Sequence, residues 1–289
     1  MATLTVTILS DVTDGSDGEL TLREAVEQAA AGDRIEFSSA LSPLVGPLPI
    51  VLTQGALVID HDLTIDGDND GDGKADFLIS GNDTSRIFEI QNSGTHARLN
   101  SLTLIGGYSS QDGGAIYAGS NTTLDLVRST VRDSHSAQQG GGIFTRGNIS
   151  VVSSTINDNS AWNEGGGIFS RGDNALLANA TVDGNTAGGM GGGVYLRDGA
   201  IEVLASTITS NSAAGGGGLT LNRTGATANV ENTVIALNSG PSDVYLGHAT
   251  NQLFASFSVF GSAPTGVGFH NAGYTLAADP GSAALADNG

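Results

Sequence analysis

The chain has 289 residues, no cysteine and a formal net charge of −19, with 11 basic against 30 acidic residues. The missing cysteine excludes disulfides, and the large negative charge disfavours binding to nucleic acid or to an anionic membrane. No apolar run reaches membrane-spanning length, so membrane insertion is not expected. Glycine is frequent, with 43 residues, and aromatic residues make up only 5% of the chain, which favours a narrow core of stacked aliphatic side chains.

The first predicted elements are a strand over residues 3–8 and a helix over residues 20–31. The helix is the one convincing helix of the sequence, since Leu22, Val26 and Ala29 share one of its faces. We expect it to cap the first coil of a repeat structure, because the ends of such structures expose open sheet edges. Residues 3–8 begin at once as a strand, without a signal peptide before them. This start predicts that the chain is a piece of a longer exported protein.

An acidic loop over residues 66–76 is the sharpest chemical motif. It carries five carboxylates: Asp66, Asp68, Asp70, Asp72 and Asp76. Alternating carboxylates with Gly73 at the sixth place match the first half of a calcium loop. Because the five charges would otherwise repel one another, we predict a structural Ca²⁺ here, with Asp76 in place of the missing glutamate at position twelve. A solvated acidic hairpin tip is the alternative.

Five glycine clusters, each running into an aliphatic residue, follow at a fixed period. The aliphatic positions are Ile116, Ile143, Ile168, Val194 and Leu219, and they lie 27, 25, 26 and 25 residues apart. A period in this range is typical of repeat architectures, in which each unit buries its apolar face by stacking on the next.

A second column of short tripeptides, mostly of the Ser-Thr-aliphatic type, runs in phase with the glycine clusters. Its members are residues 129–131, 154–156, 180–182, 206–208 and 232–234, which predicts that Thr233 stacks on Thr207. Asparagines follow at a constant offset as Asn159, Asn185 and Asn211, and Asn238 comes one residue late. Amides in tight turns bond their own backbone and the amide of the next coil, so we expect an asparagine ladder.

Short alternating runs between these columns, such as residues 122–126 and 201–203, predict half-buried strands rather than helices. Each unit of about 25 residues should form three strands joined by turns. The predicted fold is an all-β, right-handed parallel β-helix of nine to ten coils with a short N-terminal capping helix. Right-handed crossovers dominate parallel connections.

We expect a single domain over residues 1–289 and a monomer. Residues 1–34 would form the first strand and the capping helix, and residues 35–112 the early coils with the acidic loop. Residues 113–240 hold the regular repeats, and residues 241–289 would form irregular terminal coils.

The N-terminal third carries a further signature. Residues 14–26, Asp-Gly-Ser-Asp-Gly-Glu-Leu-Thr-Leu-Arg-Glu-Ala-Val, are followed by characteristic segments at 32–37 and 63–67. The pattern resembles the CSLREA segment that opens bacterial secreted β-helix proteins, although Thr21 stands where that family has cysteine. The later repeats, residues 278–281 and residues 285–289 resemble the same group. The resemblance implies a right-handed β-helix on the bacterial cell surface or in secreted form, in a group that includes adhesin-like proteins.

Aromatic and basic columns follow the glycine clusters. The aromatic column is Tyr117, Phe144, Phe169 and Tyr195, and the basic column is Arg146, Arg171 and Arg197, with Arg223 one residue out of phase. If the aliphatic residues point inward, alternation sends the rings and the arginines outward. Together with Trp162 in a preceding turn, they would form an exposed strip that binds carbohydrate, since guanidinium holds carboxylate in bidentate fashion. The alternative is a self-contained ladder that binds nothing.

The turn before the glycine-led strand offers candidates for catalysis. A polysaccharide lyase needs a cation that neutralises a uronate carboxylate and a base that takes the C5 proton. His135 as the base, with Arg146 and Arg171 as neutralising groups, is one such set. A hydrolase needs two carboxylates across a cleft, and Asp158 and Glu164 are the nearest pair.

Two functional hypotheses remain open. The first is an extracellular, calcium-stabilised β-helix module that serves as a surface, adhesive or glycan-binding scaffold without catalysis, with a polysaccharide or cell-surface glycan as partner. The second is a lyase or epimerase that acts on an acidic glycan. Short turns and the absence of a compact acid–base set favour the first.

Overall fold

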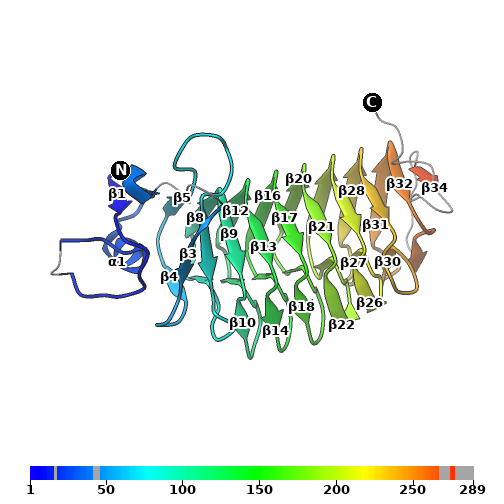
Figure 1. The fold of residues 1–289 in the computed structure, drawn as a ribbon. Coiled ribbons are helices and arrows are strands. Elements are labelled where there is room, and N and C mark those ends of the chain that lie inside the picture. The colour runs from blue at the N-terminus through cyan, green and yellow to red at the C-terminus, as the bar shows by residue number, and fades with distance from the viewer. Residues whose placement is uncertain (16–17, 42–45, 267–273, 277–289) are drawn as a thin grey trace.

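A computed structural model describes residues 1–15, 18–41, 46–266 and 274–276. The chain is an all-β parallel solenoid of about nine turns with one short helix, as predicted. Its strands lie side by side along one long axis, with the N-terminus and α1 at one end and β32 (Ser258–Phe260) near the other (Figure 1). The terminal segments 278–281 and 285–289, used for the family resemblance, lie outside the described residues.

Two long sheets form two sides of the solenoid. Sheet A contains β1 (Thr3–Val6), β2 (Asp33–Phe37), β5 (Leu63–Asp66), β8 (His96–Asn100), β12 (Thr123–Val127), β16 (Asn148–Val152), β20 (Asn174–Ala178), β24 (Ala200–Leu204), β28 (Thr227–Glu231) and β31 (Gln252–Ser256). Sheet B contains β3 (Leu48–Val51), β6 (Phe77–Ser80), β9 (Leu102–Ile105), β13 (Thr130–Arg132), β17 (Thr155–Asn157), β21 (Thr181–Asp183), β25 (Thr207–Thr209), β29 (Val234–Ala236), β32 (Ser258–Phe260) and β34 (Tyr274–Leu276).

Two further sheets complete each coil. Sheet C contains β4 (Leu57–Ile59), β7 (Phe88–Ile90), β11 (Ile116–Ala118), β15 (Ile143–Thr145), β19 (Ile168–Ser170), β23 (Val194–Leu196), β27 (Leu219–Leu221), β30 (Val244–Leu246) and β33 (Thr265–Gly266). Sheet D, along the lower edge of Figure 1, contains β10 (Tyr108–Ser109), β14 (His135–Ser136), β18 (Ser160–Ala161), β22 (Thr186–Met190) and β26 (Ser212–Gly215). The middle coils therefore have four strands rather than the predicted three.

The registers confirm the repeat columns. Ile143 pairs with Ile168, and Ile168 pairs with Val194, all of them buried in one continuous aliphatic core. One column was misaligned at its end: Thr207 pairs with Val234, so Thr233 stacks on Ser206 instead. This shift of one residue also explains why Asn238 comes late in the sequence and yet lies in the ladder.

The asparagine ladder forms as predicted. The Asn185 side-chain oxygen accepts from the backbone N–H and the side-chain amide of Asn159, both at 3.0 Å. Asn211 and Asn238 repeat this pattern, and Asp243 accepts from Asn238 at the end of the ladder. Since these groups are buried or partly buried, each coil holds the next by hydrogen bonds that water does not replace.

The corner between sheets A and B turns on one residue in the left-handed region per coil. These residues are Ser101, Arg128, Ser153, Asn179, Ala205, Asn232 and Phe257, with φ between 47° and 51°. None of them is glycine, although this conformation is costly for a residue with a Cβ atom. The following residue offsets that cost, because hydroxyls such as Ser154 Oγ accept the backbone N–H of the neighbouring coil.

Helix α1 (Leu22–Gln28) begins at a capping box formed by Thr21 and Glu24 and ends at Ala29, where the backbone becomes extended. It is shorter than the predicted range 20–31. Leu22 and Val26 are buried against the first coil, as expected for a cap. The short Ser39–Leu41 segment is a 3₁₀ turn.

Candidate functional site

The candidate site lies where strands of sheet C end and the chain turns toward sheet A. Arg146, Arg171 and Arg197 follow β15, β19 and β23, and their backbones continue the ladder: Arg171 N donates to Thr145 O at 2.9 Å, and Arg197 N to Ser170 O at 2.8 Å. Asn222, not Arg223, occupies the matching place in the next coil, because Leu196 pairs with Leu221. The basic column therefore has the predicted phase, including the offset of Arg223.

The aromatic column is not exposed, contrary to the prediction. Phe144, Phe169 and Tyr195 are 0%, 1% and 5% exposed and form a cluster of their own, outside the aliphatic core. Neighbouring rings are stacked, with centroids 5.2 Å apart for Phe144–Phe169 and 4.8 Å for Phe169–Tyr195. The rings point away from the aliphatic core, as predicted, but a second layer of residues covers them.

Glycine turns make up part of this covering layer. A Cβ atom on Gly140 or Gly165 would lie 2.8 or 2.7 Å from the Cβ of Phe144 or Phe169. On the other side, the Arg146 guanidinium lies over the rings of Phe144 and Tyr117, 5.5 and 5.9 Å from their centroids. The rings thus support Arg146, and this exposed arginine, rather than the rings beneath it, meets solvent.

The arginines border a hollow of about 230 Å³ whose lining includes Arg146, Arg171, Asn148 and Asp173. Arg171 has no ion pair or side-chain hydrogen bond within the described part of the chain. Burial, Arg197 and Arg146 lower the pKa of Arg171 below its usual value. No carboxylate within the described residues forms an ion pair with its guanidinium, although Asp173 lines the same hollow and the charge of Asp198 acts to raise its pKa.

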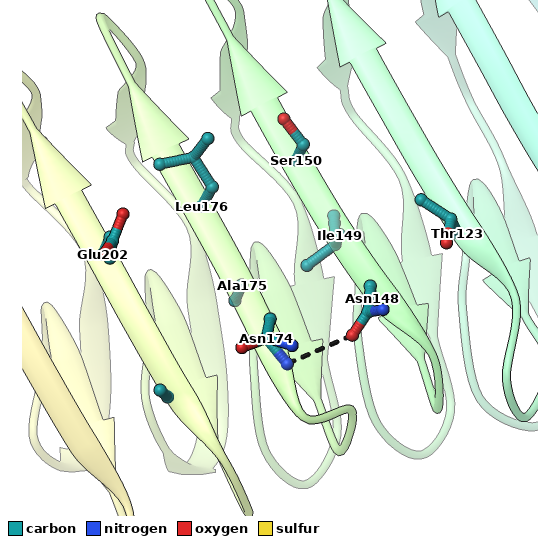
Figure 2. A pocket seen from close by; sticks show the side chains of 9 residues that line it. Thr123, Asn148, Ile149, Ser150, Asn174, Ala175, Leu176 and Glu202 are labelled. Atoms are coloured by element: carbon teal, nitrogen blue, oxygen red, sulfur yellow. Dashed lines mark hydrogen bonds between the residues drawn. The ribbon is translucent and has the colours of Figure 1, made fainter.

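A second hollow, of about 370 Å³, lies beside the first on sheet A, and Asn148 lines both (Figure 2). Asn148 and Asn174 come from the neighbouring strands β16 and β20, and the Asn148 side-chain oxygen accepts the Asn174 N–H at 3.2 Å. Leu176, Ser150 and Glu202 also line it.

A third hollow, of about 210 Å³, combines two residues of the predicted columns, Tyr117 and Arg146, with others that the sequence did not single out. Its lining includes Arg86, Glu89, Asp112, Tyr117 and Arg146. Burial raises the pKa of Asp112 above its usual value, although the Gln139 N–H and the nearby arginines act in the opposite direction. One signal was available: Asp112 stands before the first glycine cluster, as Gln139 and Glu164 stand before the next two.

The proposed catalytic set does not share one hollow. His135 lies in β14, where its Nδ1 is 2.9 Å from Ser160 Oγ and its ring stacks on Tyr108. Glu164 accepts a hydrogen bond from Gln139. Neither lines the hollow of Arg146 and Arg171. Two carboxylates do approach arginines of the column: Asp112 Oδ2 lies 3.9 Å from Arg146 Nη2, and Asp198 Oδ2 lies 3.7 Å from Arg197 Nε.

Trp162 lies on the turn after β18 and is 74% exposed. It does not line the hollows described above. The ring is nevertheless open to solvent, as a stacking surface for a sugar requires.

Three of the five acidic-loop carboxylates converge. Ligand oxygens of Asp68, Asp70 and Asp76 lie within 4.8 Å of one another. Asp72 instead pairs with Lys74 at 2.6 Å, and Asp66 is bound by Arg34 and by Asn100. The donor set of three carboxylates suits a hard divalent cation, while Asp66 and Asp72 are engaged elsewhere.

Comparisons with known proteins show a similarity of fold. The crystal structure of pectate lyase Pel9A is similar, with a TM-score of 0.57 and 9% sequence identity over 99% of this chain and 81% of that chain. No protein-family model and no curated protein sequence matches. No helix among the described residues combines the length and apolar character needed to cross a bilayer. The chain thus shares a parallel β-helix fold with a pectate lyase, and no family is assigned to it.

Proposed function

We propose that this protein is an exported β-helix module that binds an acidic polysaccharide at the corner between sheets C and A. The supporting observation is Arg171, which borders a hollow together with Arg146 and lacks a carboxylate partner within the described residues. Burial, Arg197 and Arg146 lower the pKa of Arg171, and an anionic ligand is favoured there because its charge offsets the repulsion between these cations.

The repeat gives this surface a direction. Successive coils are about 4.8 Å apart, so a polymer that lies along the solenoid axis meets Arg146, Arg171 and Arg197 on three successive coils. Guanidinium binds carboxylate through two parallel hydrogen bonds, which fixes both position and orientation. Exposed Trp162 provides an aromatic face on a neighbouring turn.

Binding to a soluble polyuronate tests the proposal. Arg171→Ala should weaken the affinity by about tenfold or more, since a hydrogen bond to a charged group contributes about 1.5–3 kcal/mol. Arg132→Ala is the matched control, because Arg132 lies in sheet B and already pairs with Asp133. Equal losses in both variants, or no binding by the parent protein, would contradict the proposal.

Cleavage or epimerisation of the same polymer is the second candidate. It is favoured by the Asp112 carboxylate beside Arg146, since a base next to a neutralising cation suits removal of the C5 proton of a uronate. Ultraviolet absorbance of an unsaturated uronate product would reveal a lyase, and proton exchange at C5 would reveal an epimerase. If the protein binds the polymer but neither signal is observed, binding without catalysis remains as its function.

We further propose that Asp68, Asp70 and Asp76 hold a structural Ca²⁺. A ligand bound only by the folded state stabilises it by about 2.7 kcal/mol at a hundredfold excess over Kd. Calcium should therefore raise the melting temperature and excess chelator should lower it. Asp70→Asn should abolish this response, whereas Asp72→Asn should keep it because Asp72 pairs with Lys74. An identical melt with calcium and with chelator would remove the assignment.

A further inference from the structure

The hollow on sheet A has a composition unlike that of the arginine hollow beside it. Glu202 is its only charged lining residue, and the remainder are small, amide or aliphatic side chains. It reaches from Thr123 in β12 to Glu202 in β24, across four neighbouring strands (Figure 2). Its length therefore runs along the solenoid axis, parallel to the arginine column.

Two amides face this hollow with free hydrogen-bonding capacity. The Asn148 side-chain oxygen accepts the Asn174 N–H, but Asn148 Nδ2 and the whole Asn174 side-chain amide have no partner within the residues that the structure describes. Both asparagines are exposed, and Leu176 beside them is half-buried. Free amides next to an aliphatic side chain match the hydroxyls and the apolar C–H face of a sugar ring.

Charge separates the two hollows. The arginine hollow, lined by two arginines and one aspartate, Asp173, attracts carboxylates, whereas Glu202 repels them from the far side of the sheet A hollow. Since Asn148 lines both, the two hollows adjoin and one sugar chain can contact both.

We propose that the sheet A hollow is the second half of the polysaccharide site, and that the site selects a polyuronate whose carboxylates lie along one edge. The carboxylates meet Arg146 and Arg171, while the uncharged edge and ring faces meet Asn148, Asn174 and Leu176. Glu202 excludes polymers that carry negative charge on both edges. This inference rests on the proposed function and adds the class of ligand and its orientation.

Isothermal titration calorimetry with three probes tests the inference: polygalacturonate, its fully methyl-esterified form and dextran sulfate. Leu176→Asp should weaken polygalacturonate binding by about tenfold. Asn174→Ala should weaken it by about threefold, the effect of one lost neutral hydrogen bond. Val152→Asp is the matched control, because Val152 is a half-buried residue of the same sheet that does not line the hollow; it should retain the parent affinity. Circular dichroism verifies that each variant is folded.

The esterified probe should bind at least about tenfold more weakly than polygalacturonate. Dextran sulfate should also bind more weakly than polygalacturonate, and Glu202→Gln should reduce the difference between the two affinities. If Arg171→Ala weakens binding but Leu176→Asp matches Val152→Asp, the sheet A hollow is not part of the site, and this inference fails while the arginine proposal stands. If dextran sulfate binds as tightly as polygalacturonate and Glu202→Gln changes neither affinity, the proposed selection of a polymer with carboxylates along one edge is wrong. Binding of none of the probes by the parent protein overturns both proposals.

Discussion

Asp112 shows at the residue scale how burial can outweigh nearby cations. Its carboxylate lies near Arg86, Arg146 and Arg171, which favour the charged form, yet its pKa is raised because burial disfavours that form more strongly. Asp112 Oδ1 is buried without a hydrogen-bond partner, which fits this balance. The sequence could not predict this, because the arginines come from coils before and after Asp112 and burial follows only from their stacking.

The raised pKa predicts a pH-dependent stability. The folded protein holds the Asp112 proton more tightly than the unfolded chain does. The stabilisation that this proton contributes is thus fully present below the ordinary aspartate pKa of 3.8. It is lost as the pH rises through the raised pKa of Asp112 in the folded protein. Asp112→Asn should therefore melt higher than the parent at neutral pH and equally at a pH below that ordinary value. Asp173→Asn, an exposed control at the same corner, should show no such pH-dependent difference in melting temperature from the parent. A less stable Asp112→Asn at neutral pH would mean that the arginines dominate.

The segment that precedes and begins α1 carries a connected set of polar contacts. Thr21 caps the helix, and Glu24 accepts from the backbone N–H groups of Thr21 and Gly15, which lower its pKa. Arg23 is buried, pairs with Asp11 at 2.7 Å and donates to the Gly55 carbonyl. The motif that resembles the CSLREA segment thus has a structural role at each of these positions in joining the cap to the first coil.

Loss of the cap should be measurable as a loss of stability. Thr21→Ala removes the side-chain oxygen that accepts the Glu24 N–H at 3.1 Å, and N-cap losses of this kind cost about 1 kcal/mol. Thr21→Ser keeps the oxygen and should stay close to the parent. Urea unfolding followed by circular dichroism compares the three proteins. Equal destabilisation by serine and alanine would assign the effect to the lost methyl group instead.

Sequence periodicity predicted the elements whose side chains alternate. The stacking of Ile143, Ile168 and Val194 followed from their spacing, and so did the asparagine ladder. Sheet D was missed because strands as short as His135–Ser136 show no alternation. Alternation also gave the direction of Phe144 but not its burial, because a side chain that points away from one core can be covered by a turn. Spacing also does not reveal that three of the five acidic-loop carboxylates converge, or that Asp66 is bound by Arg34 from another coil.

At the scale of the whole molecule, stability is a sum over contacts between neighbouring coils. The ladder hydrogen bonds, the aliphatic core and the glycine clusters all act between a coil and the next. Glycine is required where the backbones approach most closely: a Cβ atom on Gly217 would lie 2.4 Å from the Ser239 carbonyl oxygen in the following coil. A methyl group there forces two coils apart rather than disturbing one side chain.

Gly217→Ala should therefore lower the free energy of unfolding by more than about 4 kcal/mol, in the range of the most damaging single substitutions. Gly215→Ala is the matched control from the same cluster, because its Cβ would meet only the flexible Met190 side chain, at 3.3 Å; its effect should stay within about 1 kcal/mol. Hydrogen exchange should locate the damage, since nearest-neighbour coupling confines lost protection to the coils around residues 207–260 and leaves α1 and the first coils protected. Equal stability of the two variants would contradict the close approach of the coils, and uniform loss of protection through α1 would contradict the nearest-neighbour account.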